Sequence, residues 1–334
     1  MPSSNNQEPT PKAKSPNYWL KVSRPEFIPA NSASLIIGLV WGLTLPLADL
    51  FGGLAVPFVL AFAVIFLVSA FAAHINTLAD YELDREDETK KDLVLAMTKV
   101  GKGRLKKLMA FELSLSLVLL LLLTFMEGKL VFVFMWVAAV FLAYAYSAAP
   151  LRLKSRSLAA PVTLMIVLSI LPVTFVAYAF TSTLNLAFWV FLVGQAITVY
   201  SIIVPAEIRD YFSDKAAGTV TMTVQLGLVK ASLLGLTLLS VGGTLCAAGF
   251  ILEISTTSLP ILSVLLVVMA AAYFFVLSKF WKLLNLSRQL SNSANQGSVD
   301  QKIVDLAAKN PKWITIVSQS IVFMCLILLV AKII

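Results

Sequence analysis

Long apolar runs alternate with short polar segments along most of this chain. A helix needs about 20 apolar residues to cross the ~30 Å hydrocarbon core of a bilayer, and the runs lack the alternation of barrel strands. Only helices satisfy their own backbone hydrogen bonds within such segments. The pattern predicts an all-α, polytopic membrane protein with nine transmembrane helices. The predicted runs cover residues 31–52, 54–76, 105–126, 130–148, 159–180, 184–206, 229–251, 259–279 and 313–332.

Composition supports the membrane assignment. Of 334 residues, 59% are hydrophobic and 13% are charged, whereas an ordinary soluble domain has roughly one quarter charged residues. The chain carries 26 Lys and Arg residues, and all but Lys129 and Lys332 lie in the N-terminal tail and in alternate loops. Basic residues near span ends stay on the cytoplasmic side. We therefore expect a cytoplasmic N-terminus and a C-terminus on the opposite side. The basic loops are residues 81–107, 152–156, 209–230 and 279–312.

This bias also explains the net charge of +8, so the charge does not indicate a nucleic-acid partner. Residues 1–18 are rich in Ser, Asn, Pro, Gln and Lys and predict a disordered cytosolic tail, which lacks the layout of a cleavable signal peptide. Residues 19–334 form the predicted transmembrane domain. Cys246 and Cys325 lie inside predicted helices and have no metal or disulfide spacing. Nothing in the sequence indicates an obligate protein partner.

Two acidic stretches interrupt this apolar pattern where predicted helices end. Within each stretch the polar residues recur at helical spacing, i, i+4, i+8 in the first and i, i+3, i+7 in the second, so each set shares one face. Pro205 should kink or loosen the approach to the second stretch. His74 precedes the first stretch and is expected to have a hydrogen-bonded packing role. The two sets are Asn76, Asp80 and Asp84, and Glu207, Asp210 and Asp214.

The sequence D-Y-x-x-D occurs in both stretches, at 80–84 and at 210–214. This repeat predicts two four-helix halves plus one further helix around a central cavity, related by an axis along the membrane normal. The acidic faces would then oppose each other and repel unless cations lie between them. Hard oxygen ligands of this kind suit Mg²⁺, which binds through a few carboxylates and substrate phosphates. The stretches therefore predict a site with two or three Mg²⁺ ions that holds a diphosphate.

These stretches resemble motifs of the UbiA superfamily of intramembrane prenyltransferases. Residues 76–84 resemble the family's N-D-x-x-D-x-x-x-D, and residues 207–214, with Gly218 and Thr221, resemble its second aspartate motif. Residues 146–154 are similar to the family's Y-S-x-P-P-x-R-L-K, and Ser23-Arg24-Pro25 to the R-P before its first helix. Two departures are that Thr77 replaces an Asp or Gln, and Glu207 replaces an Asp.

The resemblance implies a Mg²⁺-dependent enzyme that transfers an isoprenyl group from a prenyl diphosphate to a lipophilic acceptor and releases pyrophosphate. The acceptor is left open between a quinone or aromatic precursor and a lipid. Asp80, Asp84, Asp210 and Asp214 are the implied catalytic residues and bind the metal with Asn76 and Glu207. The expected diphosphate-binding residues are Arg152, Lys154, Arg209 and Lys215, with the positive-inside bias as the alternative explanation. Tyr144, Tyr146 and Tyr211 are candidate substrate-binding residues, with packing as the alternative.

A cation-coupled transporter is the competing function. Intramembrane acids and internal repeats also mark transport pathways. The acids of this chain, however, gather at one cytoplasmic end rather than at the midplane of the membrane. Their position therefore favours the enzyme.

Overall fold

The computed structural model describes residues 17–24, 28–43, 55–86, 90–216, 218–219, 221–254, 259–292 and 296–333. All regular elements within these ranges are helices, which confirms the predicted all-α class. Most of the predicted disordered tail, residues 1–16, and Pro25 lie outside the described residues. The last residue of the predicted tail, Tyr18, already begins α1, whose N-terminus is capped by the Asn17 side chain.

The helices are α1 (Tyr18–Val22), α2 (Ile28–Gly42), α4 (Ala55–Asp84), α5 (Lys91–Val100), α6 (Lys102–Glu127), α7 (Val131–Ser147), η4 (Leu153–Ser155), α8 (Ala159–Met165), η5 (Ile166–Ile170), α9 (Leu171–Tyr178), α10 (Leu186–Ser201), α11 (Val204–Arg209), α12 (Tyr211–Ala216), α13 (Met222–Ile254), α14 (Leu259–Asn292), α15 (Gln296–Ala307) and α16 (Asn310–Ile333).

Each of the nine predicted apolar runs coincides with a helical segment. Seven segments in the described part of the chain are long and apolar enough to cross a membrane, and two shorter apolar segments, Ser32–Gly42 and Val131–Ser147, accompany them. The chain is therefore an all-helical, multi-pass membrane protein. Residues 44–52, at the end of the first predicted run, lie outside the described residues. Nine full spans remain a prediction.

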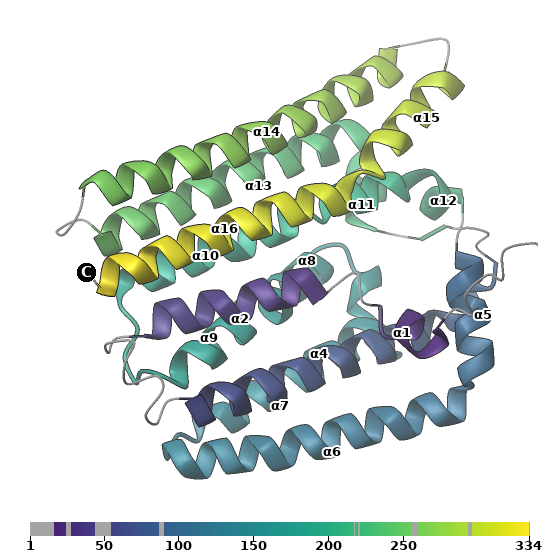
Figure 1. The fold of residues 1–334 in the computed structure, drawn as a ribbon. Helices are drawn as coiled ribbons and strands as arrows, with labels where there is room; N and C mark the ends of the chain where they lie inside the picture. Colours follow the sequence, from purple (N-terminus) through teal and green to yellow (C-terminus); the bar gives the residue numbers. More distant parts are fainter. Residues whose placement is uncertain are drawn as a thin grey trace, which may run out of the picture.

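The apolar helices form two packed groups joined by α2 and α9 (Figure 1). One core lies among α10, α13, α14 and α16 and includes Trp41 of α2, whose ring stacks 4.9 Å from Phe191. The other core lies among α2, α4, α6, α7 and α9, where the Phe132 and Phe175 rings are 5.0 Å apart. Helix α2 contributes to both cores, so it fixes the position of one group against the other.

Small residues allow α10 and α13 to approach closely at the centre of the first core. A Cβ atom built on Gly194 of α10 would lie 2.6 Å from the Cys246 nitrogen and 2.7 Å from the Gly242 oxygen, both backbone atoms of α13. Such distances are shorter than van der Waals contact, so the two backbones can pack this closely only if residue 194 has no side chain. This contact sets the spacing of the helices that lead into the second acidic stretch.

The short helices α1, α5, α11, α12 and α15 gather at one end of the bundle (Figure 1). Both acidic stretches are at this end, but the chain reaches them differently. Helix α4 runs without a break through Asp84, as the sequence predicts. Helix α10 instead ends at Ser201, and α11 begins at Val204 with Pro205 in its first turn. Proline has no N–H to donate to the Ser201 carbonyl, so the α-helix cannot continue through this point.

Candidate functional site

The end of α4 carries the first acidic stretch, and we call Asn76, Asp80 and Asp84 the first wall. Because α4 is continuous through Asp84, the predicted helical spacing holds here. The Asn76 amide oxygen accepts a hydrogen bond from Arg24 at 3.1 Å, and its nitrogen donates to the Ser147 hydroxyl at 3.3 Å. These two contacts connect the first wall to the segment after α1 and to the end of α7.

Asp80 is the most heavily paired acid of the first wall. Its Oδ1 atom accepts hydrogen bonds from Arg152, at 3.2 Å, and from Lys154. Both cations come from the turn after α7, where Arg152 has a left-handed backbone with φ of 37°. Burial lowers the pKa of Lys154, and the neighbouring Asp80 carboxylate opposes this shift. The predicted diphosphate-binding residues Arg152 and Lys154 therefore lie directly on the first wall.

Asp84 is buried, with 7% of its side chain exposed, and accepts a hydrogen bond of 2.7 Å from Lys90. A desolvated carboxylate requires a partner of this kind, because an unpaired buried charge is costly. Lys90 follows the loop after α4, and its position in sequence gave no sign of this contact.

The second acidic stretch forms the second wall, which we define as Glu207, Asp210 and Asp214. The expectation that these residues lie on a single helix is wrong, because the stretch divides into α11 and α12. Glu207 lies on α11, Asp210 at the junction, and Asp214 on α12. Asp210 keeps a right-handed helical backbone, and its carbonyl accepts a hydrogen bond from the Asp214 N–H group at 2.9 Å, so one helical i, i+4 contact still crosses the junction.

Each acid of the second wall has its own surroundings. The Glu207 Oε2 atom accepts a hydrogen bond of 2.8 Å from Thr223, a buried residue of α13. Asp210 forms two hydrogen bonds with the adjacent Arg209, at 2.7 and 2.9 Å. Burial raises the pKa of Asp214, and repulsion from Asp210 adds to the shift.

Through-space electrostatic interactions link residues of the two walls. Asp80 and Glu207 both act on Tyr146 of α7, so this tyrosine lies within reach of both walls. The Lys90 ammonium group, which pairs with Asp84, also acts on Asp214. The fold therefore brings the two acidic stretches, about 130 residues apart in sequence, to one region of the molecule.

The remaining predicted residues have different positions. The Lys215 ammonium group lies 5.8 Å from the centre of the Tyr211 ring, which also packs edge-on against Phe212. Tyr144 is 47% exposed and lines a cavity whose lining includes none of the six acidic-stretch residues. Tyr144 and Tyr146 are two residues apart on α7, so they point to different sides of the helix. Of this pair, Tyr146 is the one on which acids of both walls act electrostatically.

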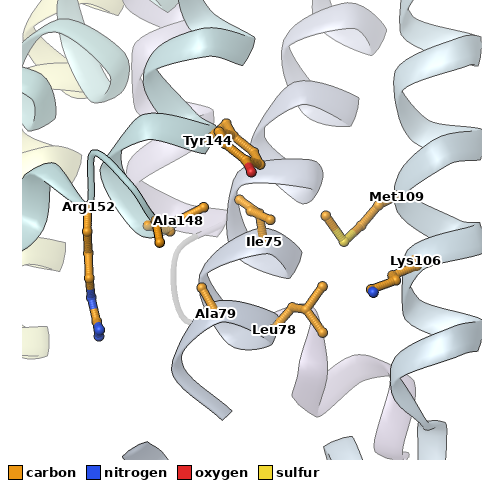
Figure 2. Close-up of a pocket in the computed structure, with 10 residues that line it drawn as sticks. Ile75, Leu78, Ala79, Lys106, Met109, Tyr144, Ala148 and Arg152 are labelled. Atoms are coloured by element: carbon orange, nitrogen blue, oxygen red, sulfur yellow. The ribbon is translucent and has the colours of Figure 1, made fainter. Parts of the chain in front are cut away.

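The cavity at Tyr144 has a volume of about 470 Å³ and lies among α4, α6 and the end of α7 (Figure 2). Ile75, Leu78 and Ala79 of α4 line it, so it opens on a different side of this helix from the first wall. Arg152 belongs to both places, because it lines the cavity and donates to Asp80. Lys106 lies at the other side of the cavity (Figure 2).

The donor atoms of the two walls suit magnesium. They are carboxylate and amide oxygens, the hard ligands that Mg²⁺ prefers. Within the described ranges, no three acidic, His or Cys side chains converge on one point as a ready metal cluster. Instead, three of the acids pair with Lys or Arg side chains: Asp80 with Lys154, Asp84 with Lys90 and Asp210 with Arg209.

The sequence did not reveal the site contacts of Arg24, Lys90 and Thr223. Arg24 entered only as part of a short motif, and Thr223 lies before the predicted apolar run 229–251, in the first turn of the observed α13. Their contacts depend on how α1, α5 and α13 pack against the walls, which local patterning does not encode.

Comparison with known proteins gives a consistent result. The model of the UbiA prenyltransferase family matches residues 35–292. No curated protein matches the chain in sequence. Among solved structures, digeranylgeranylglyceryl phosphate synthase is 17% identical with a TM-score of 0.59, over 95% of this chain and 98% of that one.

Two further similar structures are of a UbiA homologue from Archaeoglobus fulgidus. The first, bound to DMAPP and Mg²⁺, is 19% identical with a TM-score of 0.61, over 89% of this chain and 99% of that one. The second, bound to GPP and Mg²⁺, is 16% identical with a TM-score of 0.58, over 90% and 100% of the two chains. At these identities the likeness shows a shared fold.

Proposed function

Because the chain belongs to the UbiA prenyltransferase family, we propose that it transfers an isoprenyl group from a prenyl diphosphate to a lipophilic acceptor and releases pyrophosphate. The observation that carries the proposal is the pair of acidic walls at one end of an apolar bundle. A prenyl diphosphate has a highly charged head and a tail as apolar as lipid. Its head fits the charged end of the bundle, and its tail fits the membrane-embedded part.

We propose that the two walls bind the diphosphate through Mg²⁺. The Archaeoglobus fulgidus homologue is bound to Mg²⁺ with either DMAPP or GPP, which supports the same ligands for this chain. When bound, Mg²⁺ would neutralise the diphosphate and stabilise the negative charge that develops as it departs. The proposed ligands are Asn76, Asp80, Asp84, Glu207, Asp210 and Asp214, and the aspartates among them are the proposed catalytic residues.

The chain's own cations then have a second role. Arg152 and Lys154 pair with Asp80 in this structure, and Arg209 pairs with Asp210. We propose that these side chains move onto the phosphate oxygens as the diphosphate binds, because phosphate offers several acceptors for Arg and Lys. Lys215 remains a fourth candidate, although it packs on Tyr211 here.

Tyr146 is the aromatic residue best placed to contact the transferred group. It lies within electrostatic reach of both walls, and the π face of its ring can stabilise the allylic group as it becomes cationic. Exclusion of water by the surrounding helices would protect that group from hydrolysis. Tyr144 and Tyr211 remain weaker proposals for substrate contact, since Tyr144 faces the cavity on the other side of α4.

The acceptor is proposed only as a class: a quinone or aromatic precursor, or a lipid. Mass spectrometry of lipids from cells with and without the gene would identify it. We also propose that the N-terminus is cytoplasmic and the C-terminus lies on the opposite side, that residues 19–334 form one transmembrane unit behind an N-terminal tail, and that two four-helix halves plus one helix surround the central cavity.

The test is pyrophosphate release by the purified protein with Mg²⁺, allylic diphosphates of several lengths and a set of acceptors. We expect release that requires both Mg²⁺ and the diphosphate. Asp80→Asn and Asp214→Asn should each abolish it, while size-exclusion profiles and helical circular dichroism stay unchanged. A transporter would release no pyrophosphate under any of these conditions, and wild-type rates in both variants would refute the proposed walls.

A further inference from the structure

A buried chain of polar side chains leads away from the first wall. The His74 Nδ1 atom of α4 lies 3.0 Å from the Glu112 carboxylate of α6, and its Nε2 atom lies 3.0 Å from the Ser23 hydroxyl. His74 is only 2% exposed and Glu112 only 5%. We call these three residues the relay. It links three separate segments: α6, α4 and the turn after α1.

Burying such groups in an apolar bundle is unfavourable. A well-packed apolar pair of similar volume is often as stable as a buried ionic pair, or more stable, and ionisable residues within membrane helices usually serve a function. The relay lies beside a small apolar core that includes Val22, Phe71 and Ile75, where apolar side chains already provide packing. Fold stability alone therefore does not account for His74 and Glu112.

The relay fixes the segment that carries Arg24. The Ser23 hydroxyl contacts His74 and also donates to the Trp19 carbonyl at 2.9 Å, which closes the end of α1. Nearby, the Thr77 hydroxyl donates to the Val22 carbonyl at 3.4 Å. The chain thus leaves α1 from a position attached twice to α4.

Arg24 follows directly. Its backbone is left-handed, with φ of 51°, which is uncommon for a residue with a side chain. This conformation accompanies a guanidinium group that reaches Asn76 at 3.1 Å. A conformation of this kind persists where its surroundings enforce it, and the contact of Ser23 with His74 supplies that constraint one residue earlier.

We propose that Glu112 and His74 are positioning residues that act through Ser23 to set Arg24 at the rim of the diphosphate site. Glu112 accepts a hydrogen bond from the His74 Nδ1–H group and so fixes the ring orientation. The ring then holds Ser23, and Ser23 determines where the Arg24 guanidinium points. This inference rests on the proposed function, because it assigns Arg24 to the rim of that same site.

The first test measures kcat and KM for the prenyl diphosphate in Ser23→Ala, which removes only the hydroxyl that joins α1 to the relay. We expect KM to rise about tenfold, the effect of losing one well-placed charged contact worth roughly 1.4 kcal/mol, with kcat within about twofold. In the Arg24→Ala background the same change should have no further effect, because no guanidinium remains to be positioned. Full additivity of the two changes would overturn the proposal.

Two substitutions of His74 test its contact with Ser23 and its contact with Glu112 separately. Gln places its amide near the Nε2 position and can still reach Ser23, whereas Asn places its amide near Nδ1 and can reach only Glu112. His74→Gln should therefore keep a KM closer to wild type than His74→Asn. If His74→Gln and His74→Asn had the same KM and the same melting temperature, the proposed path from Glu112 through His74 to Ser23 would be contradicted. Ser240→Ala is the matched control, because that hydroxyl donates only to a carbonyl of its own helix.

A second measurement does not depend on turnover. Hydrogen exchange of the backbone amides of residues 18–24 should speed up at least tenfold in Ser23→Ala and His74→Asn, while amides of residues 60–75 in α4 stay protected. If the wild-type protein releases no pyrophosphate, the proposed function fails, and the exchange data still decide whether the relay holds α1. Unchanged exchange in both variants would refute the relay itself.

Discussion

The hydrogen bond between Thr223 and Glu207 provides a direct test of how the second wall is organised. Thr223 is 1% exposed, and its hydroxyl donates to Glu207 Oε2 at 2.8 Å. Thr223→Val replaces the hydroxyl with a methyl group of nearly the same volume. The substitution therefore removes the donor, keeps the packing and leaves one carboxylate oxygen of Glu207 without its partner.

The size of the effect follows from this geometry. A hydrogen bond to a charged group contributes about 1.5–3 kcal/mol, and each 1.4 kcal/mol is about tenfold in an equilibrium constant. Thr223 fixes the Oε2 atom of Glu207 against α13. Without the Thr223 hydroxyl, the Glu207 carboxylate is free to rotate, and fixing it when Mg²⁺ and the diphosphate bind costs free energy. We expect the Mg²⁺ concentration for half-maximal pyrophosphate release to rise roughly 10- to 100-fold.

Two variants complete this test. Thr223→Ser retains the hydroxyl and should stay within about threefold of wild type. Thr163→Val removes a buried hydroxyl that donates only to the Ala159 carbonyl of its own helix, at 2.7 Å, and should leave the Mg²⁺ dependence unchanged. If Thr223→Val had the Mg²⁺ dependence of the Thr163 control, the proposed role of Glu207 in the second wall would be refuted.

Two further predictions concern packing and charge. Gly194→Ala should destabilise the protein by about 2 kcal/mol or more, because its Cβ would meet the α13 backbone at 2.6 Å. Gly103→Ala, where nothing lies within 4 Å, is the control, and equal melting temperatures in detergent would contradict the close contact. Lys154→Gln should raise KM for the prenyl diphosphate about tenfold or more. Lys106→Gln, at the cavity beside Tyr144, should leave this KM unchanged. A larger rise in KM for Lys106→Gln than for Lys154→Gln would indicate that the diphosphate binds elsewhere.

Much of the fold could be predicted from the sequence because the membrane imposes a simple constraint. Backbone groups in hydrocarbon must be satisfied within their own segment, so apolar runs correspond to helices with little dependence on their neighbours. Helix α4 shows this clearly, since it continues through Asp84 as its spacing predicts. The interruption before α11 was also expected, because Pro205 cannot donate a backbone hydrogen bond.

The site could be predicted only in part. The sequence predicted the single continuous helix of the first wall but not the division of the second wall between α11 and α12. Spacing also could not decide between Tyr144 and Tyr146, since the choice depends on which side of α7 meets α4. Arg24 and Thr223 reach their partners from segments 52 and 16 residues away, and such contacts arise from tertiary packing.

The break between α10 and α12 gives the two walls different mechanical properties. The first wall is the tip of a single helix of 30 residues, so a displacement there must tilt a rod anchored through the whole bundle. The second wall lies on α11 and α12, two helices of six residues each. One interruption, at residues 202–203, separates α11 from α10, and a second, at Asp210, separates α11 from α12. Small backbone rotations at these two interruptions would shift its acids while α10 stays in place. If the proposed diphosphate site is correct, the second wall is therefore the side that can shift with the least disturbance of the long helices.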